Sequence, residues 1–255
     1  MARETSSFKK HVGVFVVAVV AVLSAGVTPV HAILLDWQAT SGLKPDEIGT
    51  PFTLVDTSAA NDPALSLGVL TLDTDADSEL MTYTQAGATL DMSATPVIEF
   101  NMRMVSQSSI DFPLLRTGAA VGITTLGNAG TALYIGIDEV FFLTNGGLHG
   151  DDNNTIDTDG SFYDYRIEID GLTAGSAVRL YQDNVEVLSD VLFNDSGNHG
   201  SGARIYFGNN TSVAHGTSEW TSFEHNALAV PEPGTCVLAI LGLLTLGAMR
   251  RRRQR

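Results

Sequence analysis

Two neighbouring segments, residues 162–170 (FYDYRIEID) and 177–183 (AVRLYQD), decide the fold class of this chain. In the first, apolar and aromatic residues alternate with charged ones: Tyr163, Tyr165, Ile167 and Ile169 alternate with Asp164, Arg166, Glu168 and Asp170. In the second, Val178 and Leu180 face opposite Arg179 and Tyr181. Because successive side chains of a strand point to opposite faces, this period of two predicts two half-buried β-strands. The Asp183-Asn184 pair, followed by residues 185–188, predicts a tight turn and therefore a β-hairpin.

The same kind of pattern continues along the chain. In residues 97–105 (VIEFNMRMV), four apolar side chains are predicted to share one face: Ile98, Phe100, Met102 and Met104. Further strands are predicted at 65–73, 132–143, 203–208 and 221–228, and no convincing helical period is present between residues 33 and 228. About a dozen short strands broken by Gly, Asn and Asp predict an all-β fold, an antiparallel two-sheet sandwich (jelly roll).

Charge is distributed unevenly. The chain has 255 residues, with 14 Lys and Arg against 29 Asp and Glu, for a net charge of −15. Residues 33–231 hold six of the cations and 27 of the acids, so this central body carries a net charge of −21. Nucleic acid is excluded as a partner, because phosphate binding requires a cluster of Lys and Arg. The single cysteine, Cys236, excludes a disulfide within the chain.

The N-terminus predicts a secretory signal peptide at residues 1–32. Lys9 and Lys10 precede an apolar run at 12–22 (VGVFVVAVVAV), and Val30-His31-Ala32 offers a cleavage site after Ala32. The secretion machinery is therefore an expected partner. An uncleaved N-terminal anchor is the alternative.

The C-terminus, residues 230–255, contains three elements in order. Pro231-Glu232-Pro233 precedes an apolar segment at 236–249 (CVLAILGLLTLGAM), which is followed by the predicted membrane stop, Arg250, Arg251, Arg252 and Arg253. The apolar segment would form a short transmembrane helix, with the arginines on the cytoplasmic side and the acidic body outside.

This arrangement resembles the PEP-CTERM sorting signal of exported bacterial proteins. The resemblance implies processing near Pro231-Glu232-Pro233 by an exosortase-like enzyme. It also implies anchoring by the C-terminal helix, followed by delivery to the cell surface or extracellular matrix.

The central hairpin also resembles a known fold family. Residues 163–171 (YDYRIEIDG) and 178–184 (VRLYQDN) are similar to the central hairpin of concanavalin A-like (laminin-G-like) domains, with Asn184 in the place of the common Gly. The segments 205–208 (IYFG) and 220–223 (WTSF) are similar to the closing strands of that fold. The resemblance spans residues 33–228 and implies two packed antiparallel sheets. The fold hosts lectins, glucanases and adhesion modules, so the resemblance does not by itself imply sugar binding.

Catalytic residues are not predicted. Glu168 and Asp170, at positions i and i+2, resemble the start of the Glu-x-Asp-x-x-Glu motif of laminarinase-type glucanases, but Thr173 stands where the third acid is required. A solvent-facing polar strand edge is the expected role of this pair. The body histidines lie among Gly, Asn and Ser, and the chain contains no Gly-x-Ser-x-Gly or His-Glu-x-x-His motif.

Calcium is the candidate cofactor that the sequence indicates. The loop 151–160 (DDNNTIDTDG) offers four carboxylates as oxygen ligands: Asp151, Asp152, Asp157 and Asp159. A second acidic segment, 73–79 (DTDADSE), is a weaker candidate. Solvated connections with Asx turns are the alternative in both places.

Five aromatic residues are candidates for stacking on sugar rings or for a place in the core: Trp37, Trp220, Tyr134, Tyr181 and Tyr206. The sequence therefore predicts an exported, non-enzymatic surface or matrix protein, with a polysaccharide as a candidate ligand. A glycan-active hydrolase of the same fold and a purely structural matrix component are the alternatives.

Overall fold

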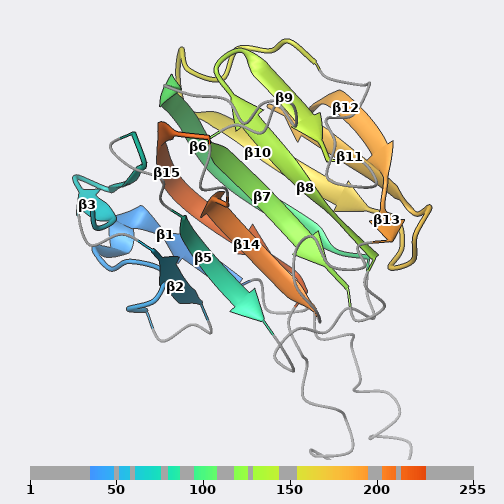
Figure 1. Ribbon diagram of the computed structural model, residues 1–255, viewed down its shortest axis with the longest axis horizontal. Coiled ribbons are helices and arrows are strands. Elements are labelled where there is room, and N and C mark those ends of the chain that lie inside the picture. The colour runs from blue at the N-terminus through green and yellow to red at the C-terminus, as the bar shows by residue number, and fades with distance from the viewer. Residues whose placement is uncertain are drawn as a thin grey trace, which may run out of the picture. The chain divides into compact units, whose positions relative to one another are not determined.

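A computed structural model of the chain describes ten segments: residues 35–48, 52–57, 61–75, 80–86, 95–107, 118–125, 129–143, 154–194, 203–210 and 214–227. All of them belong to one compact unit, Leu34–Arg255. The predicted signal peptide and the predicted C-terminal transmembrane helix lie outside the described residues. Fifteen strands and one 3-10 helix, η1 (Ala39–Ser41), form the described part (Figure 1).

One layer of the molecule is an eight-stranded antiparallel sheet in the order β12-β11-β10-β6-β15-β4-β3, with β1 also paired to β15. Its strands are β1 (Leu35–Gln38), β3 (Ala64–Ser66), β4 (Val69–Asp73), β6 (Val97–Gln107), β10 (Tyr163–Ile169), β11 (Ala177–Gln182), β12 (Val185–Val191) and β15 (Gly216–His225).

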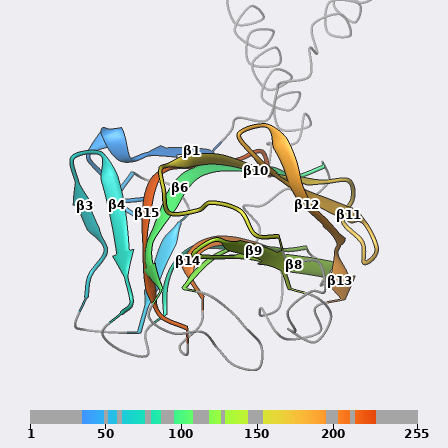
Figure 2. The same cartoon turned by 90° about the horizontal axis from the view of Figure 1, so that it is seen from above.

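The other layer is a seven-stranded antiparallel sheet in the order β13-β8-β7-β14-β5-β2, with β9 paired to β8. Its strands are β2 (Thr53–Asp56), β5 (Met81–Ala86), β7 (Ala119–Thr124), β8 (Ala129–Gly136), β9 (Glu139–Phe142), β13 (Phe193–Asn194) and β14 (Arg204–Asn209). Figure 2 shows the two sheets as two layers packed face to face. The predicted all-β, two-sheet antiparallel sandwich is confirmed in the described residues.

The hairpin that decided the fold class forms as the sequence predicted. β10 pairs with β11, with Ile167 opposite Leu180, and β11 pairs with β12 across the Asp183-Asn184 turn. Both turn residues have positive φ, 50° and 67°, which is the backbone of a tight hairpin turn. The predicted alternation of β6 is also confirmed, because its four apolar side chains (Ile98, Phe100, Met102 and Met104) are buried.

Two segments that the sequence predicted as single strands each form a β-hairpin in the structure. The segment 65–73 divides into β3 and β4 at a turn formed by Leu67 and Gly68, which have φ values of 52° and 77°. The segment 132–143 divides into β8 and β9 around Asp138, which has a φ of 59°. In the second case every residue of β8 is buried. Its sequence is therefore a nearly continuous apolar run, and the pattern does not reveal the turn that follows it. The last strand also begins earlier than predicted, at Gly216 rather than at residue 221.

The main core lies between the sheets and is rich in aromatic rings. Phe207 of β14 lies 4.3 Å from Phe223 and 5.0 Å from Trp220, measured between ring centroids, and both partners belong to β15 of the other sheet. Aromatic pairs at such distances add to the stabilisation that comes from burying their area. These contacts connect the centres of the two sheets.

A second, smaller apolar cluster lies on the opposite, outer face of the seven-stranded sheet. Its members are Ala120, Ala132, Tyr134, Phe141, Leu143 and Tyr206. Tyr206 lies over Gly122 on the neighbouring strand, where a Cβ atom would come within 2.2 Å of the tyrosine ring. The sheet is therefore buried on both faces at this point, in contrast to the outer face of the eight-stranded sheet, where polar side chains dominate.

Candidate functional site

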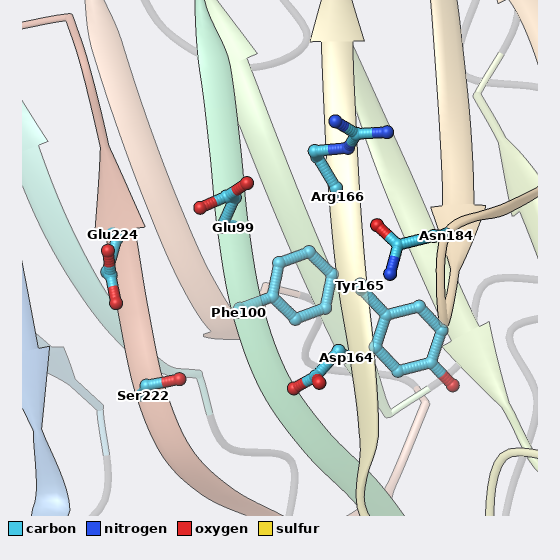
Figure 3. Close-up of a pocket in the computed structure, with 8 residues that line it drawn as sticks. All are labelled: Glu99, Phe100, Asp164, Tyr165, Arg166, Asn184, Ser222 and Glu224. Atoms are coloured by element: carbon cyan, nitrogen blue, oxygen red, sulfur yellow. The ribbon is translucent and has the colours of Figure 1, made fainter.

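A cavity of about 250 Å³ lies on the outer, polar face of the eight-stranded sheet, over β10, β6 and β15 (Figure 3). Its lining comprises Glu99, Phe100, Asp164, Tyr165, Arg166, Asn184, Ser222 and Glu224. Phe100 and Tyr165 are buried core residues, and their rings stack 5.1 Å apart. The remaining six side chains are polar or charged.

Strand alternation places these polar groups together. Glu99 of β6 lies opposite both Arg166 of β10 and Glu224 of β15 in the sheet register, so the three residues form one row across three strands. Asp164 lies in the next row, opposite Asn101. Asn184 comes from the β11–β12 turn. Residues that are up to about 125 positions apart in the chain therefore line one hollow.

Arg166, the one cation among the described residues of the lining, is already engaged. Nη1 of Arg166 lies 3.1 Å from Oε1 of Glu168, and its guanidinium carbon lies 4.5 Å from the centre of the Tyr181 ring. Nε of Arg166 is buried and has no hydrogen-bond partner among the described residues.

Two carboxylates of the lining accept hydrogen bonds from amide side chains. Asp164 accepts a hydrogen bond of 2.7 Å from Nδ2 of Asn101, and Glu224 accepts one of 3.0 Å from Nε2 of Gln38. Glu99 is exposed and has no hydrogen bond or ion pair with the described residues. Hydroxyl-rich ligands are recognised by such a mixture of acceptors and donors placed in a concave site.

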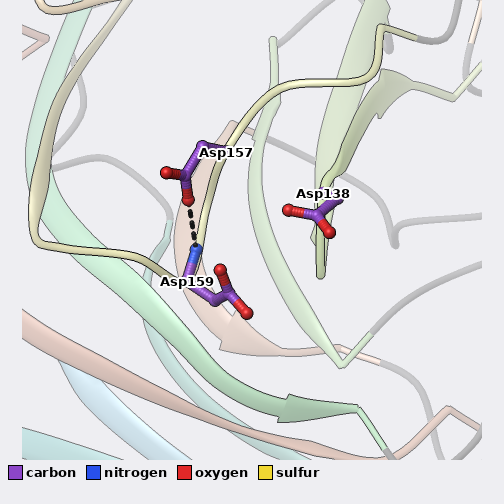
Figure 4. A group of neighbouring side chains, drawn as sticks. All are labelled: Asp138, Asp157 and Asp159. Atoms are coloured by element: carbon purple, nitrogen blue, oxygen red, sulfur yellow. Dashed lines mark hydrogen bonds between the residues drawn. The ribbon is translucent and has the colours of Figure 1, made fainter.

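A separate group of carboxylates gathers at the β8–β9 turn. Carboxylate oxygens of Asp138, Asp157 and Asp159 lie within 4.8 Å of one another, and all three residues are exposed (Figure 4). Asp157 accepts hydrogen bonds from the backbone N–H groups of Gly160, at 2.9 Å, and Asp159, at 3.2 Å. The hydroxyl of Tyr163, followed by the Gly160 N–H, lowers the pKa of Asp157 below its usual value. Asp157 is therefore ionised and already turned toward its neighbours.

Two of the four predicted calcium ligands, Asp157 and Asp159, are thus brought together, whereas Asp151 and Asp152 lie outside the described residues. Sequence reasoning missed Asp138, because it falls inside the run that was predicted as one continuous strand. In the second predicted segment, Thr217 donates hydrogen bonds to Asp73 and Asp75, and Ser106 donates one to Asp75. Residues 76–79 of that segment lie outside the described residues.

Glu168 and Asp170 are both held by arginines. Asp170 follows the end of β10, and its two oxygens accept hydrogen bonds of 3.0 and 2.7 Å from Arg179. These bonds lower the pKa of Asp170, whereas the general acid of a glycosidase requires a raised pKa. Glu168 pairs with Arg166. This arrangement favours the structural role that the sequence predicted for the pair.

The five candidate stacking aromatics occupy three environments. Trp37 and Trp220 are fully buried in the main core, and Tyr134 and Tyr206 belong to the second cluster on the seven-stranded sheet. Tyr181 is half-buried beneath Arg166 on the outer face of the eight-stranded sheet. Tyr181 contacts Arg166 and Trp220 contacts Phe100, and both of these neighbours line the polar cavity.

Comparison with known proteins identifies the C-terminal signal. Residues 229–253 match the family model of the PEP-CTERM protein-sorting motif, which confirms the motif predicted at Pro231-Glu232-Pro233. No curated protein matches the chain. Among the described residues, no helix is both long enough and apolar enough to cross a membrane.

Solved structures with a similar arrangement include carbohydrate-related proteins. The carbohydrate recognition domain of Emp46p is 13% identical, with a TM-score of 0.46, and the match covers 71% of this chain and 89% of that one. The exoplasmic/lumenal domain of VIP36, in a form with Ca²⁺ and Man3GlcNAc bound, is 11% identical, with a TM-score of 0.44 and coverages of 74% and 89%. An endo-1,3-beta-glucanase from Streptomyces sioyaensis is 11% identical, with a TM-score of 0.43 and coverages of 66% and 79%. Similarities this distant carry no conclusion about a ligand of this chain.

Proposed function

We propose that this protein is an exported polysaccharide-binding β-sandwich that binds without catalysis. The observation that carries the proposal is the cavity on the eight-stranded sheet, where carboxylate, amide, hydroxyl and guanidinium groups converge. Sugar hydroxyls donate and accept hydrogen bonds, so such a lining suits them. The ion-paired state of Glu168 and Asp170 supports binding rather than hydrolysis.

The PEP-CTERM motif implies export and processing by an exosortase. In the proposed layout, residues 1–32 are a signal peptide cleaved after Ala32, residues 33–228 form the binding domain, and residues 230–255 form the sorting signal. The apolar segment 236–249 and the arginines 250–253 would hold the protein in the membrane until processing delivers it to the cell surface or matrix. A purely structural matrix component with the same sorting signal is the competing function.

Filling the cavity should abolish glycan binding. The Ser222→Trp substitution places a large ring in the hollow, and we expect affinity for any bound glycan to fall at least about tenfold. The measurement is a glycan-array screen of the full-length protein in detergent, followed by calorimetry with the best ligand. Ser189→Trp is the matched control, because Ser189 is exposed on β12 of the same sheet and does not line the cavity.

Absence of binding to every glycan on the array would overturn the proposal in favour of a structural component. Equal binding by the wild type and by Ser222→Trp would show that the glycan binds outside the cavity. Melting temperatures of both variants show whether the fold is retained.

We further propose that Asp138, Asp157 and Asp159 bind calcium, because the structure adds a third carboxylate to the two that the sequence had selected. Exported modules bind calcium with dissociation constants of about 0.1–1 mM. For a constant of about 1 mM, calcium at about 10 mM should raise the free energy of unfolding by about 1.4 kcal/mol. The melting temperature should then rise by about 3–6 °C relative to EDTA.

In this experiment the Asp138→Asn variant should lose the calcium-dependent rise. Asp62→Asn, which neutralises an exposed acid outside the cluster, should retain it. A rise of equal size in both variants, or no rise in the wild type, would contradict calcium binding at these three residues.

A further inference from the structure

We propose that Asn226 fastens the end of the folded domain, and that local opening at this residue limits the rate at which the processing enzyme reaches the sorting motif. This inference rests on the proposed function, because it concerns the enzyme that the motif implies. It depends on three hydrogen bonds of Asn226, on the burial of the next residue, and on the short stretch of sequence between that residue and the motif.

The end of β15 is held on both sides. His225, the last residue of β15, lies opposite Ile98 of β6 and opposite Leu35 of β1, and its side chain is fully buried. Opening the chain at His225 would break its pairing with two strands and expose that side chain. Local opening from the C-terminal side is therefore confined to the residues that follow His225.

Asn226 extends the pairing with β6 by one residue. Its backbone N–H donates a hydrogen bond of 3.2 Å to the carbonyl oxygen of Val97, and its Oδ1 accepts one of 2.8 Å from the Val97 N–H. Its Nδ2 donates one of 3.3 Å to the carbonyl oxygen of Thr95. Ala227 follows and is buried as part of the main core. The chain is therefore fastened to the sheet as far as Ala227.

The sorting motif follows almost at once. Residues 229–253 match the motif, and only residues 228–230 separate Ala227 from Pro231. These residues span at most about 10 Å when fully extended. Enzymes cut extended segments, so cutting beside a folded domain proceeds through locally opened states. Release of Asn226 and Ala227 would extend the accessible stretch before Pro231 to residues 226–230.

The Asn226→Ala variant tests this control of access. It removes both side-chain hydrogen bonds and keeps the backbone one. Two neutral hydrogen bonds correspond to about a tenfold change in the opening equilibrium, so processing should become about tenfold faster. The measurement is pulse–chase labelling of the full-length chain in cells that also produce an exosortase, with conversion to the shortened form followed on gels.

A spacer separates the access of the enzyme from the stability of the fold. A Gly-Ser insertion of about eight residues between Leu228 and Ala229 adds about 25 Å of extended chain. It supplies an accessible segment without opening at Asn226, so processing should be at least about tenfold faster than in the wild type. Asn226→Ala should then add less than about twofold, because the two changes act on the same step. A merely structural role of Asn226 would not depend on the spacer.

Thr221→Ala is the matched control. The Thr221 hydroxyl donates a hydrogen bond of 2.6 Å to Oδ1 of Asn101 on β6, so this variant loses a side-chain bond between the same two strands without touching Asn226. It should be processed at the wild-type rate. Amide hydrogen exchange of the purified full-length protein in detergent measures opening directly. Exchange at position 226 should become about tenfold faster in Asn226→Ala and stay unchanged in Thr221→Ala.

Faster exchange in Asn226→Ala with an unchanged rate of processing would overturn the inference. Equal acceleration of processing by Thr221→Ala would overturn it too, because the cause would then be the stability of the whole domain. Slower processing of the spacer form would show that the enzyme requires the folded domain beside the motif, which is the opposite of the inference. These three results leave the proposed function intact. If no form of the chain is processed, the inference and the proposed sorting both fail.

Discussion

The Phe207→Ala variant should lose about 4 kcal/mol of unfolding free energy, a value typical of aromatic truncation in a closed core. Phe207 is fully buried on β14, in the seven-stranded sheet. Its ring contacts Trp220 and Phe223 of the eight-stranded sheet. The side chain therefore connects the two layers, and its removal leaves a cavity between them.

Further buried rings surround Phe207, from its own sheet, from the segment before β2 and from β1 of the other sheet. Tyr83 stacks on it at 5.4 Å, Phe52 meets it edge-on at 5.8 Å, and Trp37 lies at 6.1 Å. Large rigid neighbours collapse poorly into a vacated space, so the cavity left by the ring should persist and the full loss of about 4 kcal/mol is expected. Urea unfolding monitored by tryptophan fluorescence measures the change.

Phe162→Ala is the matched control for this prediction. Phe162 is half-buried and contacts Arg103, whose guanidinium carbon lies 4.9 Å from the ring centre. Its truncation should cost about 1 kcal/mol. If the two variants lose the same stability, Phe207 is not central to the packing of the two sheets.

Acid should destabilise the protein through His225. This residue of β15 is fully buried against Phe52 and Phe223, and burial lowers the pKa of its imidazole to about 4. Nε2 lies 2.8 Å from Oε1 of Gln85, and Nδ1 is buried without a partner among the described residues. The native state therefore keeps this histidine neutral.

The direction of the effect follows from the two pKa values. The unfolded chain binds a proton below about pH 6.5, but the native state does so only below about pH 4. Between these values the unfolded state holds more protons, so the free energy of unfolding falls as pH falls. The loss is about 1.4 kcal/mol per pH unit, or about 3 kcal/mol across the window, and it is absent above about pH 6.5.

The His225→Gln variant should remove this pH dependence while keeping an amide that can hydrogen bond to Gln85. The measurement is urea unfolding of both proteins at several pH values between about 7.5 and 4. For each protein the free energy of unfolding is plotted against pH. The difference between the two slopes gives the contribution of His225, separate from that of the carboxylates that also titrate at the acidic end. Parallel slopes for the two proteins would show that His225 is not the group responsible.

Local patterns predicted the parts of the fold that have one polar and one buried face. β6, β10 and β11 alternate cleanly because their outer face meets solvent, so the period of two is visible in the sequence. β8 is buried on both faces, and its apolar run conceals the Asp138 turn. The β3–β4 turn was missed because Leu67, a fully exposed leucine with positive φ, gives no turn signal.

The candidate sites were predicted less completely than the fold. Asp157 and Asp159 are two positions apart, so one loop was enough to select them, whereas Asp138 joins them only through the β8–β9 turn. The cavity was not predicted from the sequence. Glu99, Arg166 and Glu224 belong to three different strands, and no spacing along the chain connects them.

The sequence alone determined the sorting signal, the acidic character of the body and the all-β class, since each of these depends on composition or on the order of nearby residues. Tertiary structure decided which carboxylates share the cavity and which are neutralised by arginine. It also decided that Tyr134 and Tyr206 form a cluster separate from Trp37 and Trp220. The physical reason is that strand register joins residues distant in the chain, and register depends on how two whole sheets pack.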